Sequence, residues 1–150
     1  MGIGSAIIKD AKKFLDKAAM VQVEAFKQPS FGKGDAGTLH GERSDANGYR
    51  FLRITLFGTP NIKCVKGCTL IFEGASGNIT CASDTKDIES VYSETIGKGI
   101  TTFEIYLDDE LFQSLKTPIN GVRMTFPRKL FGKDAFSFQV ESAAFSKFLK

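Results

Sequence analysis

The clearest β-strand pattern of the chain is Tyr49-Arg50-Phe51-Leu52-Arg53-Ile54-Thr55-Leu56-Phe57, whose side chains alternate with the two-residue period of a strand. One face carries Leu52, Ile54 and Leu56, and the other carries Tyr49, Phe51, Arg53, Thr55 and Phe57. Both faces are largely apolar, which predicts a central strand that is covered on both sides.

Toward the C-terminus the same alternation recurs and predicts short antiparallel strands. Residues 68–73 and 79–81 flank Gly74-Ala75-Ser76-Gly77, which is the pattern of a hairpin. Further strands are expected at residues 103–107, 122–126 and 136–140. Asp108 or Asp109 is suited to cap a short internal helix, and Ser142 is suited to cap a C-terminal helix.

Toward the N-terminus the pattern is less regular. Residues 30–48 are rich in Gly and Asp and end in the turn pair Asn47-Gly48, so they form either a short strand at 38–43 or a long loop. Over residues 3–19, apolar side chains recur on one helical face and lysines on the other, which predicts an amphipathic helix.

We therefore expect an α+β protein. It would have a mostly antiparallel curled sheet or sandwich of about six to eight short strands, with an N-terminal amphipathic helix, a short internal helix and a C-terminal helix. The elements do not alternate as in a doubly wound parallel sheet. Neither a repeat nor a linker divides the sequence, so residues 1–150 are expected to form a single domain.

Composition adds two features to this picture. The chain contains 14 Phe and no Trp, which favours a core built on phenyl rings over a ring-lined cavity for an apolar ligand. The formal net charge is +3, but residues 84–110 carry eight carboxylates against two lysines, so this segment is −6 and the remainder is +9. Such polarity can steer a partner or support head-to-tail association.

The cysteines and the single histidine offer little for catalysis or metal binding. Cys64, Cys68 and Cys81 are odd in number, and their spacing matches structural zinc sites poorly. His40 has no sequence context that places it near a thiol or a serine nucleophile. We therefore expect no cofactor and no metal, and free thiols typical of a cytoplasmic protein.

Two groups of residues are candidate binding positions. Tyr49, Phe51 and Arg53 share a strand face that could stack nucleobases, although packing under the N-terminal helix is the simpler interpretation. Asp108 and Asp109 could bind a cation or act in acid–base chemistry, although capping of a helix is the simpler interpretation.

The sequence itself leaves the function open, and we recognise no family in it. Our first hypothesis is that the protein is a non-enzymatic protein-interaction module, whose partner could also be a second copy of the chain. The alternatives are a carrier of an apolar small molecule, an enzyme with carboxylate chemistry, and a binder of single-stranded nucleic acid. A protein partner or a second copy is favoured over nucleic acid and over a membrane surface contacted by the N-terminal helix.

Overall fold

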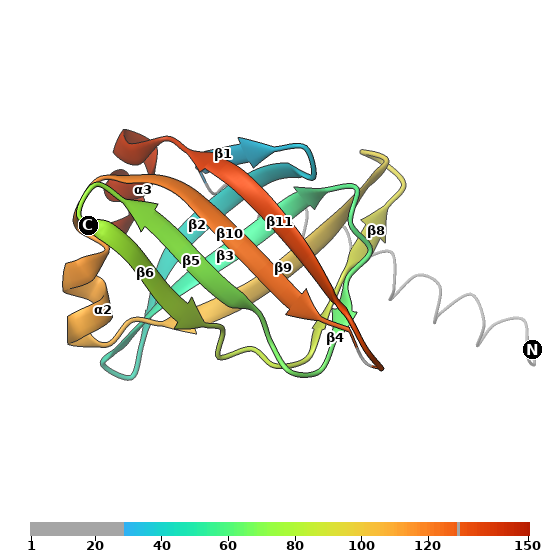
Figure 1. Cartoon of the computed structure of the whole chain (residues 1–150), viewed down its shortest axis with the longest axis horizontal. Coiled ribbons are helices and arrows are strands. Elements are labelled where there is room, and N and C mark those ends of the chain that lie inside the picture. The colour runs from blue at the N-terminus through green and yellow to red at the C-terminus, as the bar shows by residue number, and fades with distance from the viewer. Residues whose placement is uncertain (1–28, 129) are drawn as a thin grey trace, which may run out of the picture.

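The computed structural model describes residues 29–128 and 130–150, and in them the chain forms one long antiparallel sheet that curls over itself (Figure 1). The strands of this sheet follow the order β6-β5-β10-β11-β1-β2-β3-β9-β8. They are β1 (Ser30–Gly34), β2 (Gly37–Ala46), β3 (Tyr49–Gly58), β5 (Thr69–Gly74), β6 (Gly77–Ala82), β8 (Val91–Ser93), β9 (Lys98–Tyr106), β10 (Ile119–Pro127) and β11 (Lys133–Val140).

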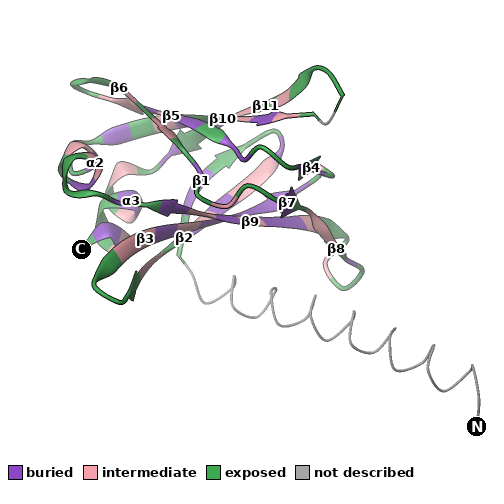
Figure 2. Ribbon diagram, turned by 90° about the horizontal axis from the view of Figure 1, so that it is seen from below, coloured by how far each residue is buried: buried purple, intermediate pink, exposed green. Residues whose placement is uncertain are grey.

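The curl produces two layers with the core between them (Figure 2). One layer contains β6, β5, β10 and β11, the other contains β2, β3, β9 and β8, and β1 joins them by pairing with both β11 and β2. Helices α2 (Asp109–Ser114) and α3 (Ser142–Leu149) lie at one end of the layers, and the small sheet of β4 (Lys63–Cys64) and β7 (Ile88–Glu89) lies at the other (Figure 2).

Phenylalanine rings fill much of the space between the layers. Phe145 of α3 contacts Phe31 and Phe72, with ring centroids 5.4 and 5.6 Å apart, and Phe103 meets Phe126 across the core at 5.9 Å. All five side chains are at most 1% exposed. Their packing explains the high phenylalanine content, because each such ring buries a large apolar area.

The side of the sandwich between β6 and β9 is bridged by the chain that follows β6. The Asp84 amide donates to the Glu104 carbonyl at 2.8 Å, and the Glu104 amide donates to the Thr85 hydroxyl at 3.0 Å. These bonds provide partners for backbone groups on the outer edge of β9, which β8 pairs only at residues 98–100.

The expectation of an α+β class is wrong. In the described residues strands account for 58% and helices for 12%, so the protein is mainly β. The number of strands was also underestimated, because the described part contains eleven. The additional strands are β1, in the Gly- and Asp-rich residues 30–48, and the two-residue strands β4 and β7, while β2 extends the short strand that was one alternative for residues 38–43. The predicted N-terminal helix lies outside the described residues.

Candidate functional site

Three aromatic rings lie together on the outer surface of the β2–β3–β9 layer. Tyr49 and Phe51 point outward from β3, and the register of β3 with β9 sets Tyr106 directly opposite Phe51. The Tyr106 ring centroid is 5.7 Å from that of Tyr49 and 5.7 Å from that of Phe51. We call Tyr49, Phe51 and Tyr106 the aromatic face. Its tyrosines are 55% and 37% exposed, and Phe51 is half-buried.

Arg53 lies next to the aromatic face and ties the neighbouring strands together. Its Nε and Nη2 atoms donate to the Glu104 carboxylate on β9 at 3.1 and 2.9 Å. Its Nη1 atom is 3.9 Å from the Glu42 carboxylate on β2. The guanidinium group therefore links three neighbouring strands, and these contacts fix the positions of the side chains on their outer surface.

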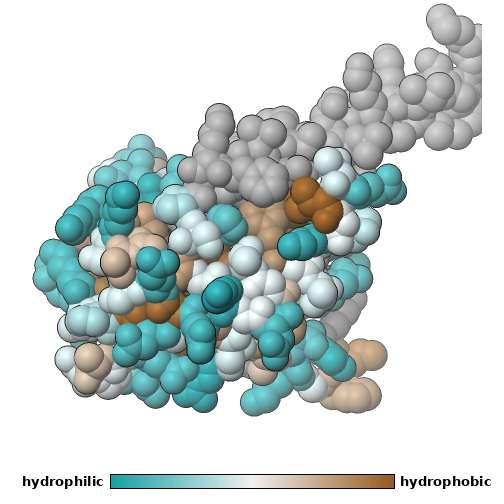
Figure 3. Space-filling view, turned by 90° about the horizontal axis from the view of Figure 1, so that it is seen from above, coloured by the Kyte–Doolittle hydropathy of each residue, from teal (hydrophilic) through white to brown (hydrophobic). Residues whose placement is uncertain are grey.

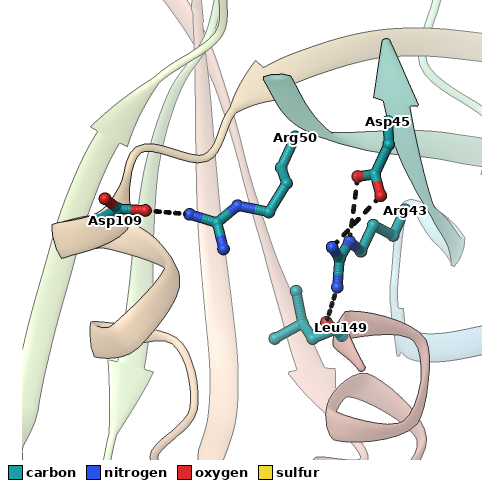
Figure 4. A network of polar contacts seen from close by, with 5 residues as sticks. All are labelled: Arg43, Asp45, Arg50, Asp109 and Leu149. Atoms are coloured by element: carbon teal, nitrogen blue, oxygen red, sulfur yellow. Dashed lines mark hydrogen bonds and ion pairs between the residues drawn. The ribbon is translucent and has the colours of Figure 1, made fainter. Parts of the chain in front are cut away.

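Asp108 and Asp109 both take part in local structure. The Asp108 carboxylate accepts a hydrogen bond from the Leu111 amide at 2.8 Å and caps the N-terminus of α2. Asp109 forms an ion pair with Arg50, whose guanidinium lies 4.2 Å from the ring centroid of Phe112 (Figure 4). Helix capping thus accounts for Asp108, and anchoring of α2 to β3 accounts for Asp109.

The structure brings the two predicted groups of residues to the same end of the molecule. β3 begins and β9 ends there, and the Leu107 amide donates to the Arg50 carbonyl at 2.8 Å. The surroundings are acidic: Asp84, Asp108 and Glu110 make no ion pair with any residue in the described ranges. The Asp84 carboxylate accepts a hydrogen bond from the backbone amide of Tyr106, which places this charge beside the aromatic face.

A second group of polar contacts, around Arg43, lies at the same end of the molecule. Arg43 donates to both oxygens of Asp45, at 3.2 and 3.3 Å, and to the Leu149 carbonyl at the end of α3, at 3.1 Å (Figure 4). These contacts attach α3 to β2 and leave the aromatic face on the opposite surface of the layer.

The cysteines form no disulfide, and two of them are poor nucleophiles. Cys64 and Cys68 are buried, and Cys81 is half-buried. Burial raises the pKa of Cys68 well above its ordinary value, and burial together with the Asp84 carboxylate raises the pKa of Cys81 to about 12. Thiols with such pKa values are protonated and poorly nucleophilic near neutral pH. No group of three or more metal-ligating side chains occurs in the described parts of the chain.

Two of the hollows lined by described residues lie on the β1–β11 side of the structure. The larger, of about 660 Å³, is lined by polar and short residues that include Gly34, Gly121 and Ser137, with Phe138 as the one phenylalanine of its described lining. The smaller, of about 330 Å³, lies over β1 and includes Phe31 and Thr38. Neither has the ring-lined interior that an apolar ligand prefers.

No family model, curated protein or solved structure matches the chain. None of the helices in the described residues is long and apolar enough to span a membrane.

The sequence gives no sign that Tyr106 joins Tyr49 and Phe51. Its alternation with Glu104 and Thr102 placed it on one face of a strand, but only the pairing of β9 with β3 sets it against Phe51. The sequence-based predictions also missed the exposed pair Leu130 and Phe131 in the β10–β11 connection. The available signal was an apolar pair within a basic turn, Arg128-Lys129-Leu130-Phe131-Gly132-Lys133.

Proposed function

We propose that this chain is a non-enzymatic protein-interaction module and that the aromatic face is its docking site. The observation that carries the proposal is the exposed pair Tyr49 and Tyr106, held edge to face beside Phe51 on two paired strands. Tyrosine is enriched at the energetic centres of protein interfaces, because its ring supplies contact area and its hydroxyl supplies a hydrogen bond.

The aromatic face is built on a rigid support. β3 and β9 pair without a register shift from Phe51 and Tyr106 to Gly58 and Gly99. The hydrogen bonds from Arg53 to Glu104 fix the same two strands beside the rings. Because little freedom remains to be lost, a partner that docks here avoids much of the entropic cost of ordering side chains.

Charge indicates what kind of partner fits. The carboxylates of Asp84, Asp108 and Glu110 lie at this end of the molecule without an ion pair to any described residue, so the field around the rings attracts cations. The preferred partner is a polypeptide that presents a large apolar side chain flanked by lysine or arginine. The same field repels phosphate, which disfavours nucleic acid as the ligand.

Selection of short random displayed peptides against the wild-type chain tests this proposal. The matched proteins are the face variant Tyr49→Ser/Tyr106→Ser and the control Tyr92→Ser, which removes another exposed tyrosine from β8. We expect selected peptides to combine an apolar residue with basic neighbours, and to bind the face variant at least about tenfold more weakly than wild type. The control should bind as wild type does.

Equal binding of the selected peptides to the wild type and the face variant would contradict the assignment. Peptides enriched in acidic rather than basic residues would contradict the proposed partner chemistry. Retention of the wild-type circular dichroism spectrum and melting temperature by the face variant separates loss of binding from loss of folding.

A further inference from the structure

The connection between β10 and β11 presents two large apolar side chains to solvent. Leu130 is 88% exposed and Phe131 is 85% exposed, the highest values among the large hydrophobic side chains of the described residues. On the side of the molecule seen in Figure 3, hydrophobic surface of the described residues occurs as separate patches between hydrophilic ones. We call Leu130, Phe131 and Gly132 the hairpin tip. Such exposure at one projecting turn is typical of an interaction site.

The hairpin tip is held in place by the strands that carry it. β10 and β11 pair in continuous register from Gly121 and Gln139 to Pro127 and Lys133, and the Arg128 amide donates to the Gly132 carbonyl at 2.9 Å. The Arg128 side chain donates to Asp134 at 2.7 and 3.1 Å. The apolar pair is therefore presented on a formed hairpin.

The charge around the hairpin tip is opposite to that around the aromatic face. By sequence, residues 127–134 contain Arg128, Lys129 and Lys133 against the single carboxylate of Asp134, so their net charge is +2. Because β5 starts opposite Thr125 of β10, the turn between β4 and β5 lies at the same end of the sheet and adds Lys66 and the exposed Val65, while Glu89 of β7 pairs with Lys63 of β4. The tip thus offers apolar side chains with basic neighbours, which is the chemistry the aromatic face favours.

The hairpin tip and the aromatic face lie at opposite ends of the molecule. Strands β11, β1, β2 and β3 are successive antiparallel neighbours, so the direction from Gln139 to Lys133 along β11 is the same as the direction from Phe57 to Gly58 along β3. The hairpin tip, which lies beyond Lys133, is therefore at the end of the sheet away from Tyr49. Figure 1 shows the β2–β3 turn at the end near α2 and the β10–β11 connection at the other. One molecule cannot bring its own tip to its own face.

From these observations we infer that the partner of the aromatic face is a second copy of this chain, which packs its hairpin tip against the tyrosine rings and the carboxylates beside them. This inference rests on the proposed function and names its ligand. The contact is heterologous, since each copy contributes a different surface. Repetition of the contact joins copies head to tail, either into a closed ring or into an open filament.

Two variants with complementary defects test the inference in the full chain. The tip variant Leu130→Ser/Phe131→Ser keeps the aromatic face, and the face variant Tyr49→Ser/Tyr106→Ser keeps the hairpin tip. In sedimentation velocity we expect wild type to associate as its concentration rises, and each variant alone to remain a monomer. An equimolar mixture of the variants should form a one-to-one dimer and nothing larger, because each copy then has one working surface. Tyr92→Ser should associate as wild type does.

A monomeric wild type at every concentration would overturn the inference, as would variants that still associate alone or fail to pair when mixed. Selected peptides that bind the aromatic face of a monomeric wild type would leave the proposed function standing with a different partner. Binding of the chain to phosphatidylserine-containing vesicles that is lost in the tip variant, without pairing of the mixed variants, would instead make the hairpin tip a membrane contact. Circular dichroism of both variants verifies that they fold.

Discussion

Asp108, a candidate for acid–base chemistry or cation binding in the sequence, is a helix-capping residue in the structure. Its carboxylate accepts the Leu111 amide hydrogen at the start of α2, where the first amides of a helix lack intrahelical partners. Its place directly before an apolar helical pattern already indicated this role in the sequence. The sequence could not indicate that Asp109 would reach Arg50, because that ion pair depends on where β3 passes.

Replacement of Asp108 tests the capping role. Asp108→Ala should lower the free energy of unfolding by about 1 kcal/mol, because the Leu111 amide loses its acceptor. Asp108→Asn should lower the free energy of unfolding by no more than a few tenths of a kcal/mol, because asparagine caps helices as well as aspartate does. Urea denaturation measures both. Equal losses in the two variants would show that the charge, and not the cap, is what stabilises α2.

The buried thiols give the stability of the protein a dependence on alkaline pH. The pKa of Cys81 rises from 9.0 to about 12 on folding, and that of Cys68 rises as well, so the folded chain retains protons that the unfolded chain releases. Stability should therefore fall as the pH rises from about 9 toward 12. The double variant Cys68→Ala/Cys81→Ala should show a flatter dependence over that range. Identical slopes for the two proteins in denaturation series would contradict this.

At the scale of elements, alternation predicted β3, missed β1, and left open whether residues 38–43 of β2 form a strand or a loop, for an identifiable reason. A Cβ atom at Gly41 would lie 2.6 Å from the Phe148 ring, and one at Gly34 would lie 2.3 Å from the Ser137 carbonyl oxygen. These glycines make room for α3 and for the neighbouring strand. Their number makes residues 30–48 resemble a loop, because the packing that requires them involves residues about a hundred positions away.

Gly37 is the position at which this close packing can be tested. Its φ is +146°, and a Cβ atom there would lie 1.9 Å from the Phe57 carbonyl oxygen. Gly37→Ala should lower the free energy of unfolding by more than about 2 kcal/mol or abolish folding, because backbone strain and a clash combine. Gly48, with φ +82° and open space around it, is the matched control.

Gly48→Ala carries the backbone strain without the clash, so it should cost about 1 kcal/mol. Chemical denaturation of both variants gives the comparison. Equal losses would show that the conformation of Gly37, rather than its contact with β3, sets its cost.

At the scale of the whole molecule, the acidic segment read from the sequence is divided between the two ends. Asp84 and the carboxylates at the start of α2 lie at the end that carries the aromatic face, whereas Glu89 of β7 lies at the other end, where the basic residues of the β10–β11 connection outnumber the carboxylate of Asp134. Composition alone predicted the polarity. It could not predict that exposed rings would lie at one pole and exposed Leu130 and Phe131 at the other, because both depend on strand order.

The most direct measurement follows the backbone amide resonances of ¹⁵N-labelled tip variant, whose aromatic face is intact, during addition of unlabelled face variant. We expect saturable shifts centred on Tyr49, Phe51 and Tyr106, and weaker binding in added salt because opposite charges meet in the contact. Shifts centred elsewhere, such as along the outer edge of β6, or no shifts at any concentration, would contradict the inference.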